Sequence, residues 1–369
     1  MTTYIQTKQP DTSHRLAYVD MAKGIGMLAI IWGHIMLSGW SNNLVYSFHI
    51  PLFFFLSGMM FNGSKYADLG SLVKRRAKTL LLPYLMFSFV TWLLWAILSV
   101  VSHSGANLFR PLLQTFIAQG SGGFMVHNVP LWFVTCLFVV EVIYYFVQKL
   151  PDWANVLICI VCALIGDYMI RGGHLSFFRL LPWNIEGAMS ALLFYALGNL
   201  LIKNCSHQKV VDTVNNNWIT CILIIIILTI CLFFSANWNG HITLGSNSLG
   251  KNTMVFYINA FIGILTTISL SILLSKVTDK AIIKIPLRYI QWFGENSFFV
   301  MASHVPVKSM LILMISKIAH LTPIAFSKSI KLSLLAFLLT LIVDSVVVFL
   351  IAKLKKHDEA LVQKLRKTK

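Results

Sequence analysis

Runs of apolar residues, separated by short polar segments, recur along almost the whole chain. A helix needs about 20 mainly apolar residues to cross the hydrocarbon core of a membrane. Runs of about this length cover residues 20–38, 44–62, 79–102, 130–149, 152–170, 181–202, 217–235, 254–275, 289–315 and 331–353. The pattern therefore predicts an all-α, polytopic membrane protein with about ten transmembrane helices.

The composition supports this class of protein and bounds its domain organisation. The 369 residues are 57% hydrophobic and 12% charged, with a net charge of +17, whereas soluble domains hold about 25% charged residues. The basic residues fall in short groups between apolar runs and form no single basic face, so nucleic acid is not expected as a partner. We expect one membrane domain over residues 20–353, between an N-terminal segment (1–19) and a basic tail (354–369).

The distribution of Lys and Arg predicts the orientation of the chain. If the N-terminus is cytoplasmic, the segments on that side hold 21 Lys and Arg residues and the segments on the other side hold seven. Cytoplasmic loops of membrane proteins are enriched in basic residues, so both termini are expected to be cytoplasmic. The two longest outer loops, about 103–129 and 236–253, are rich in Gly, Ser and Asn, which suits polar contacts with an extracytoplasmic partner.

Three polar residues share one face of the first predicted helix. At 100° per residue, Lys23 and His34 lie about 20° apart around the helix axis, and Asp20 lies within roughly 40° of His34. Along the axis, His34 lies ~16 Å from Lys23, toward the outer side of the membrane. Ionisable groups inside a membrane are costly and usually functional, so this face is a candidate site.

Two further histidines are candidates beside His34. His304, in the ninth predicted helix, lies at a depth similar to that of His34, and His49 opens the second helix at the outer surface. Each histidine can instead be a packing residue that is hydrogen-bonded to a backbone carbonyl. Three histidines can also ligate zinc, but no HxxxH or HExxH pairing supports a metal site, and none is expected.

Buried carboxylates and a basic cluster complete the candidate residues. Glu186 lies near the outer end of its predicted span, whereas Glu141 and Asp344 are expected to play a structural role, each paired with a buried Lys, Tyr or His. The basic cluster comprises Lys74, Arg75, Arg76 and Lys78. This cluster either anchors its helix on the cytoplasmic side or binds an anionic ligand, because Arg holds phosphate oxygens with a rigid bidentate fork.

Six stretches of the chain together resemble the acyltransferase 3 family of membrane acyltransferases. These are RLAYVDMAKGIGMLAIIWGH (15–34), FHIPLFFFLSGMMF (48–61), KRRAKTLLLPY (74–84), PLWFVTCLF (130–138), LPWNIEGAMSALLFYALGNL (181–200) and GENSFFVMASH (294–304). The first two are the specific ones, and all six follow the expected order over most of the chain. The resemblance is closest to the branch similar to fucose 4-O-acetylases and polysaccharide O-acetyltransferases.

The resemblance implies an O-acetyltransferase of the bacterial inner (cytoplasmic) membrane. Members of the family carry an acyl group, typically acetyl from cytoplasmic acetyl-CoA, to a hydroxyl of an extracytoplasmic or lipid-linked sugar or polysaccharide. Acetyl-CoA as cosubstrate, such a glycan as acceptor and membrane lipid are therefore the expected partners. The resemblance implies about ten helices, in agreement with the hydropathy pattern.

The resemblance also implies roles for the catalytic candidates. His34 matches the family's helix-one histidine, which acts either as a general base toward the acceptor hydroxyl or as a covalent acyl carrier. His304, Asp20 and Glu186 complete the expected catalytic set. The depth of His34 suits transfer of a group across the membrane.

For the donor, the resemblance implies a binding path at the cytoplasmic side. Lys23 is expected to line the path of the pantetheine arm, and Arg75 and Arg76 are expected to hold the CoA phosphates. Many relatives carry an Arg-x-x-Arg pattern here, whereas in this chain Lys78 follows Arg75 by three residues. Lys78 supplies charge without the bidentate fork of Arg.

Two other function classes compete with the acyltransferase. A transporter or polysaccharide exporter is compatible with ten helices and buried charges, but the sequence shows neither discontinuous helices nor an internal inverted repeat, the features that favour transport. The second class is a non-catalytic membrane interaction protein. The polar face that carries Asp20, Lys23 and His34 argues against it, because that role does not require such a face.

Overall fold

The protein is almost entirely helical in its computed structural model. The structure describes residues 16–35, 39–120, 123–171, 181–246, 248–278, 283–318, 320 and 329–367. Within these residues, the β-structure consists of an isolated bridge between Thr243 and Ser248. Most of the predicted N-terminal segment, residues 1–15, lies outside the described residues.

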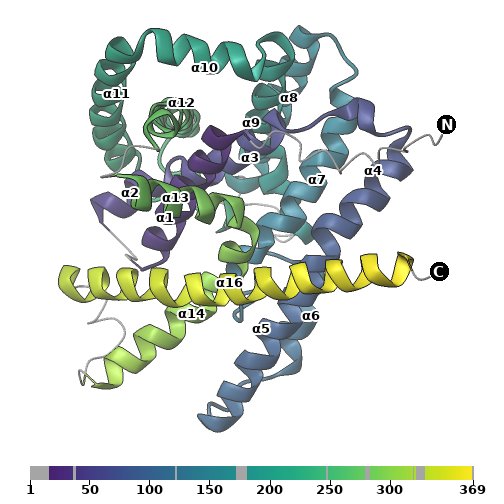
Figure 1. Ribbon diagram of the computed structural model, residues 1–369, viewed down its shortest axis with the longest axis vertical. Coiled ribbons are helices and arrows are strands. Elements are labelled where there is room, and N and C mark those ends of the chain that lie inside the picture. The colour runs from purple at the N-terminus through teal and green to yellow at the C-terminus, as the bar shows by residue number, and fades with distance from the viewer. Residues whose placement is uncertain are drawn as a thin grey trace, which may run out of the picture.

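The residues that the structure describes form fifteen α-helices and several shorter helical turns (Figure 1). The α-helices are α1 (Ala17–Ile35), α2 (Trp40–Tyr46), α3 (His49–Met59), α4 (Leu69–Arg76), α5 (Leu82–Val101), α6 (Phe109–Ile117), α7 (Trp132–Val147), α8 (Asp152–Arg171), α9 (Ile185–Asn204), α10 (His207–Asn216), α11 (Trp218–Asn239), α12 (Thr253–Val277), α13 (Lys284–Glu295), α14 (Ser297–Ile318) and α16 (Ile330–Lys367). A π-helical segment, Ala77–Leu81, joins α4 to α5.

Eight stretches of helix among the described residues are long and apolar enough to cross a membrane. They are Leu69–Val101, Val129–Val147, Asp152–Met169, Pro182–Asn204, Trp218–Asn239, Thr253–Val277, Ser297–Ile318 and Ile330–Leu354. Each overlaps one of the ten predicted spans. Several apolar helices of this length are typical of a multi-pass membrane protein.

The first two predicted spans, 20–38 and 44–62, are not among these eight. The first forms α1, whose 19 residues include polar groups. The second is divided between α2 and α3, and the 11 residues of α3 rise by only about 16 Å, roughly half the thickness of the hydrocarbon core. The division falls at Ser47 and Phe48 because Pro51 has no N–H to offer the carbonyl of Ser47. The expectation of about ten transmembrane helices is therefore not confirmed by the described residues.

The ninth predicted span, 289–315, is also discontinuous. Its first residues belong to α13, and the chain leaves helical geometry at Asn296, whose side-chain amide donates to the Trp292 carbonyl at 2.9 Å. An Asn side chain that bonds the preceding turn competes with continuation of the helix. The spanning helix α14 begins only after this break, and the last predicted span continues as α16 beyond 353 to Lys367.

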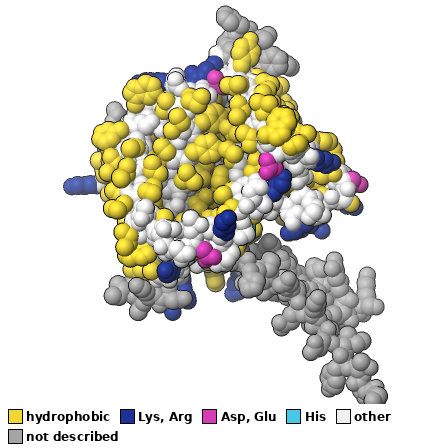
Figure 2. Space-filling view, turned by 90° about the horizontal axis from the view of Figure 1, so that it is seen from above, with side chains coloured by type: hydrophobic (Ala, Val, Ile, Leu, Met, Phe, Trp, Pro, Cys, Tyr) yellow, Lys and Arg dark blue, Asp and Glu magenta, His cyan; other side chains and the backbone are white. Residues whose placement is uncertain are grey.

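Two apolar cores hold these helices together. One lies between α3, α7, α9 and α12, and the other lies between α1, α14 and α16. Large apolar side chains are exposed along α5, α8, α11 and α16. Figure 2 shows such side chains covering most of one face, with charged side chains in small separate groups. This is the surface expected of helices that contact lipid tails.

Glycines let two pairs of helices approach backbone to backbone. A Cβ atom built on Gly24 of α1 overlaps the Ile290 carbonyl of α13, and one built on Gly294 of α13 overlaps the Asp20 carbonyl. Helices α3 and α9 make the same kind of contact through Gly58. Small residues at helix interfaces permit this spacing in membrane proteins, and here they fix α1 against α13.

Candidate functional site

A cavity of about 210 Å³ lies where the two apolar cores meet. Its wall on α1 consists of Lys23, Met27, Ile30 and His34, which recur at the three- and four-residue intervals of one helical face. Lys23 and His34, which the helical period predicts to share this face, both line the same cavity. The other walls come from α3, α7, α14 and Leu80 of the π-helical segment.

The cavity has two chemically different ends. At the Lys23 end, Ser57 of α3 and Ser297 of α14 add hydroxyl groups to the wall. Between this end and His34 the wall is apolar, with Phe53 and Phe133 among its side chains. Lys23 and His34 are 11 residues apart, so the passage extends for roughly 16 Å along α1.

His34 lies beside His304 at the other end of the cavity. The centroids of the two imidazole rings are 5.2 Å apart, with planes inclined by 46°. His304 is fully buried on α14, whereas His34 is only partly buried. The structure thus brings together two histidines that are far apart in sequence and that the sequence analysis placed at similar depth.

The His304 ring is oriented by a hydrogen bond to the backbone one turn earlier, and the backbone near it is adapted to Pro306. His304 Nδ1 donates to the Val300 carbonyl at 2.9 Å, so in the neutral ring Nε2 carries the free lone pair. Within the described residues, this Nε2 has no hydrogen-bond partner. Pro306 has no N–H for the Ala302 carbonyl, and the Asn128 side chain donates to that carbonyl at 2.7 Å.

Lys308 is a site residue that the sequence analysis missed. Its Nζ donates to the His34 carbonyl at 3.3 Å, which places a cation next to the backbone of the cavity histidine. Lys308 follows His304 by four residues and so lies on the same face of α14. That spacing is the signal by which it could have been found.

Tyr46 also packs beside His34 and was likewise missed. Its ring centroid is 6.3 Å from that of His34 and 4.8 Å from that of His49. A Cβ atom on Gly33 would lie 2.6 Å from the Tyr46 ring, so only glycine lets the ring pack this closely. His49 is buried and its Nδ1 donates to the Val45 carbonyl at 2.6 Å.

Arg76 of the basic cluster pairs with the buried carboxylate of Glu141. Arg76 Nε lies 2.6 Å from Glu141 Oε2, and the two side chains are 23% and 2% exposed. The Tyr195 hydroxyl donates to Glu141 Oε1 at 3.4 Å. The pair lies one helical turn beyond the cavity residues Leu80 and Leu137, on the side away from His34. The structural pairing expected for Glu141 thus involves a tyrosine, as proposed, and also this arginine.

The other members of the basic cluster are exposed. The side chains of Lys74, Arg75 and Lys78 are exposed at the surface of the protein. The Arg75 guanidinium lies 5.8 Å from the centroid of the Tyr66 ring. Asp20, one turn before Lys23, is buried and its carboxylate lies 3.9 Å from Lys23 Nζ. Asp20 does not belong to the residues that line the cavity.

Glu186 has a different environment from the histidine pair. It is fully buried at the start of α9, and Gln119 Nε2 donates to its Oε1 at 2.7 Å. Glu186 is not among the residues that line the cavity between Lys23 and His34. The structure therefore does not bring this member of the expected catalytic set to the cavity.

Asp344, expected to pair with a Lys, Tyr or His, instead accepts a hydrogen bond from the Ser303 hydroxyl at 2.5 Å. Ser303 precedes His304 on α14, so this buried carboxylate stabilises the turn that carries the histidine. In the part of the chain that the structure describes, no group of three or more His, Cys, Asp and Glu side chains is arranged to hold a metal ion.

Comparison with known proteins places the chain in a functional class. The model of a protein family described as an acyltransferase domain matches residues 16–352, which is most of the sequence and contains every candidate residue above. No curated protein and no solved structure matches the chain.

Proposed function

The chain belongs to this acyltransferase family, and we propose that it moves an acetyl group from cytoplasmic acetyl-CoA to a hydroxyl of an extracytoplasmic or lipid-linked sugar or polysaccharide. It acts in the bacterial inner membrane with both termini in the cytoplasm, as the excess of basic residues on that side favours. The branch similar to fucose 4-O-acetylases is part of the same proposal.

The cavity between Lys23 and His34 is the observation that carries this proposal. A narrow, mostly apolar passage suits a flexible acyl-bearing arm, because it removes water from the thioester before the acceptor arrives. The cation at one end of the passage suits the anionic part of the donor, and the histidine at the other end suits proton transfer at the acyl carbon. A cavity that is only a gap in the packing does not require a lysine at one end and a histidine at the other.

For the donor, we assign the CoA phosphates to the basic cluster. Arg75 and Lys78 present their charges to solvent. Arg76 uses Nε for Glu141, which leaves the two terminal amino groups of its guanidinium for a phosphate oxygen. Lys23 then contacts the arm where it enters the cavity.

For the transfer step, His34 acts through its neutral imidazole. The ring takes the proton of the acceptor hydroxyl as the oxygen attacks the thioester carbonyl, and the resulting tetrahedral intermediate collapses with cleavage of the C–S bond. The imidazolium returns the proton to the leaving thiolate, so free CoA and an O-acetyl ester are formed. His304 orients His34 and shields it from water, and Lys308 holds the backbone at His34. Asp20 pairs with the Lys23 ammonium group and holds it in position. Glu186 has a structural role, because it binds the Gln119 side chain.

The direct test is chemical analysis of surface glycans from cells with and without the gene. We expect mild base to release acetate from the glycan of cells that carry the gene and little or none from cells that lack it. The measurement is normalised to the amount of glycan, and restoration of the gene should restore the ester. Equal ester content in both strains would contradict the proposed acceptor class.

The donor site makes a separate prediction. Replacing Arg75 by alanine should weaken acetyl-CoA binding by about tenfold, because a charge-assisted contact to phosphate contributes roughly 1.5–3 kcal/mol before solvent screening. Equilibrium binding of labelled acetyl-CoA to membranes measures this effect. Lys276→Ala is the control, because Lys276 is also exposed but lies in the last turn of α12. Equal binding by the Arg75→Ala variant and the parent would make Arg75 a topology anchor.

Divided spans favour transport instead. The predicted second span is divided at Ser47 and Phe48 and the ninth at Asn296, and transporters use discontinuous helices of this kind to bind solutes. The glycan test separates the functions: an exporter changes the amount of glycan at the surface, whereas an acetyltransferase changes the ester content per unit of glycan.

A further inference from the structure

A series of rings leads from the cavity histidine to the protein surface. Tyr46, which packs beside His34, has its ring centroid 4.8 Å from that of His241. His241 is exposed and follows α11 in the loop that leads to α12. The cavity side of the series is apolar and the His241 side is open to solvent, so the rings connect the reacting histidine with the outside.

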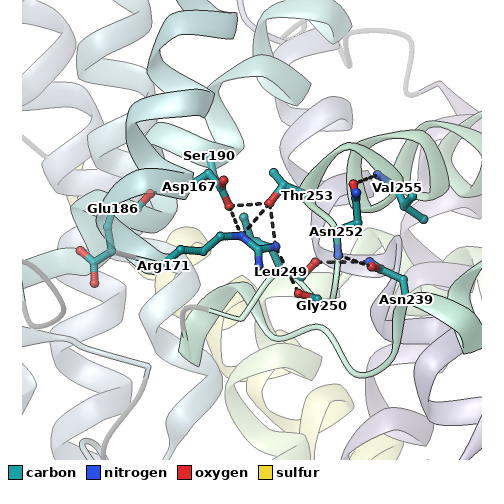
Figure 3. A network of polar contacts seen from close by, with 10 residues as sticks. All are labelled: Asp167, Arg171, Glu186, Ser190, Asn239, Leu249, Gly250, Asn252, Thr253 and Val255. Atoms are coloured by element: carbon teal, nitrogen blue, oxygen red, sulfur yellow. Dashed lines mark hydrogen bonds and ion pairs between the residues drawn. The ribbon is translucent and has the colours of Figure 1, made fainter. Parts of the chain in front are cut away.

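The loop that carries His241 is held firmly in place. At its base, Asn239 Oδ1 accepts from the backbone N–H of Asn252 at 2.8 Å, and the Lys251 N–H donates to the Asn239 carbonyl at 2.9 Å. Figure 3 shows this contact beside the Gly250 turn. Thr243 and Ser248 pair across the loop, so its two arms keep a fixed separation.

A second set of contacts ties the same loop to α8. Arg171 Nη2 donates to the Gly250 carbonyl at 3.1 Å, and Arg171 Nε donates to Asp167 at 2.7 Å. The Thr253 hydroxyl donates to Asp167 Oδ1 at 2.5 Å, which closes the network drawn in Figure 3. These contacts hold the loop from the side of α8, and the His241 imidazole takes no part in them.

Amide groups line the surface beside these rings. The Asn43 side chain of α2 donates to Asn237 Oδ1 at 3.4 Å, and Asn237 Nδ2 donates to the Phe233 carbonyl at 2.8 Å. The exposed ring of Trp40 packs on Phe233. Aromatic faces next to amide and imidazole groups match the chemistry of a sugar, whose C–H faces pack on rings and whose hydroxyls both donate and accept.

We propose that Tyr46 and His241 form the subsite for the acceptor sugar, placed so that one sugar hydroxyl passes Tyr46 and reaches His34. The inference rests on the proposed function and adds the acceptor-binding residues to it. The rigid loop presents His241 to the sugar in a fixed position, which lowers the entropic cost of binding.

The uncharged form of the His241 ring suits hydrogen bonding to a sugar hydroxyl. Part of the His241 ring is open to solvent, and desolvation of the remainder lowers the pKa of His241 below its usual value, which favours the uncharged ring at neutral pH. A neutral imidazole has one donor and one acceptor nitrogen, and it can therefore bind a hydroxyl in either direction.

The test measures acetyl transfer against acceptor concentration. Membranes with the full-length protein receive labelled acetyl-CoA and surface glycan of the same cells from which mild base has removed the ester groups. His241→Ala should raise the glycan concentration at half-maximal rate by about fivefold to tenfold, the effect of losing one good hydrogen bond. Binding of labelled acetyl-CoA should not change. Tyr46→Phe, which keeps the ring that packs on Gly33, should shift the same concentration in the same direction.

His103→Ala is the matched control, because His103 is another exposed histidine in a loop, at the end of α5. It should transfer like the parent. An unchanged half-saturating glycan concentration in both test variants overturns the subsite, and so does an equal shift in the control. A parent protein that binds acetyl-CoA but acetylates no glycan overturns the proposed function together with the subsite.

Discussion

Replacing His34 by glutamine is expected to lower acetyl transfer by about 10²–10⁴-fold, the usual cost of losing a general base. Glutamine has a similar size and forms hydrogen bonds, but its amide takes up no proton near neutral pH. His34 is only partly buried and its ring contacts are with His304 and Tyr46, so the variant should fold and insert. Base-released acetate, normalised to the amount of the protein in the membrane, measures the effect.

Two further variants sharpen the result. His304→Gln should be less damaging, because His304 touches His34 and not the acceptor in the proposed mechanism. His103→Gln, which changes an exposed histidine far along the chain, should be neutral. Full acetylation by the His34→Gln strain would make His34 a packing residue and would leave transport as the better reading of the cavity.

Replacing Arg76 by alanine is expected to destabilise the protein by about 3–5 kcal/mol. The change leaves the buried carboxylate of Glu141 without its cation, and breaking one partner of a buried pair costs this much. Removing the charge as well, in the double variant Arg76→Ala/Glu141→Gln, should restore most of the loss. Thermal unfolding in detergent and the yield of inserted protein measure both effects.

Arg75→Ala supplies the comparison, because it makes the same change one residue earlier at an exposed position. It should leave the unfolding midpoint almost unchanged, as surface substitutions generally do, although it weakens donor binding. If Arg76→Ala proves as stable as Arg75→Ala, the Arg76–Glu141 pair has no structural role and the carboxylate is held by Tyr195 alone.

The hydropathy pattern predicted the class of fold and about ten spanning helices, eight of which correspond to long apolar helices among the described residues, but it missed the breaks. Apolar content says where a helix can enter lipid, whereas continuity depends on single residues. Pro51 interrupts the second predicted span, and Asn296 interrupts the ninth. Pro83 has no N–H for the Thr79 carbonyl, and the backbone around Thr79 widens into the π-helical segment. Each of these residues is visible in the sequence, but an apolar-run count ignores them.

The candidate site was predictable where one helix carries it. Helical periodicity alone placed Lys23 on the same face as His34, and equal depth paired His34 with His304. Contacts between remote segments were not predictable in this way. The pairing of Arg76 with Glu141 depends on how α4 packs on α7, and the approach of His241 to Tyr46 depends on a loop that no local pattern specifies.

The glycine contacts along α1 also determine how the two sides of the membrane communicate. Gly24 lies against the backbone of α13, and Gly33 lies against the Tyr46 ring, so α1 cannot slide or rotate past its neighbours without a collision. Alternating exposure of the cavity by rocking of helices is thereby opposed. In the proposed function, donor and acceptor would therefore meet inside a protein whose helices keep their positions. The proposal then requires only the acyl group to cross, so that acyl transfer would leave the membrane potential intact.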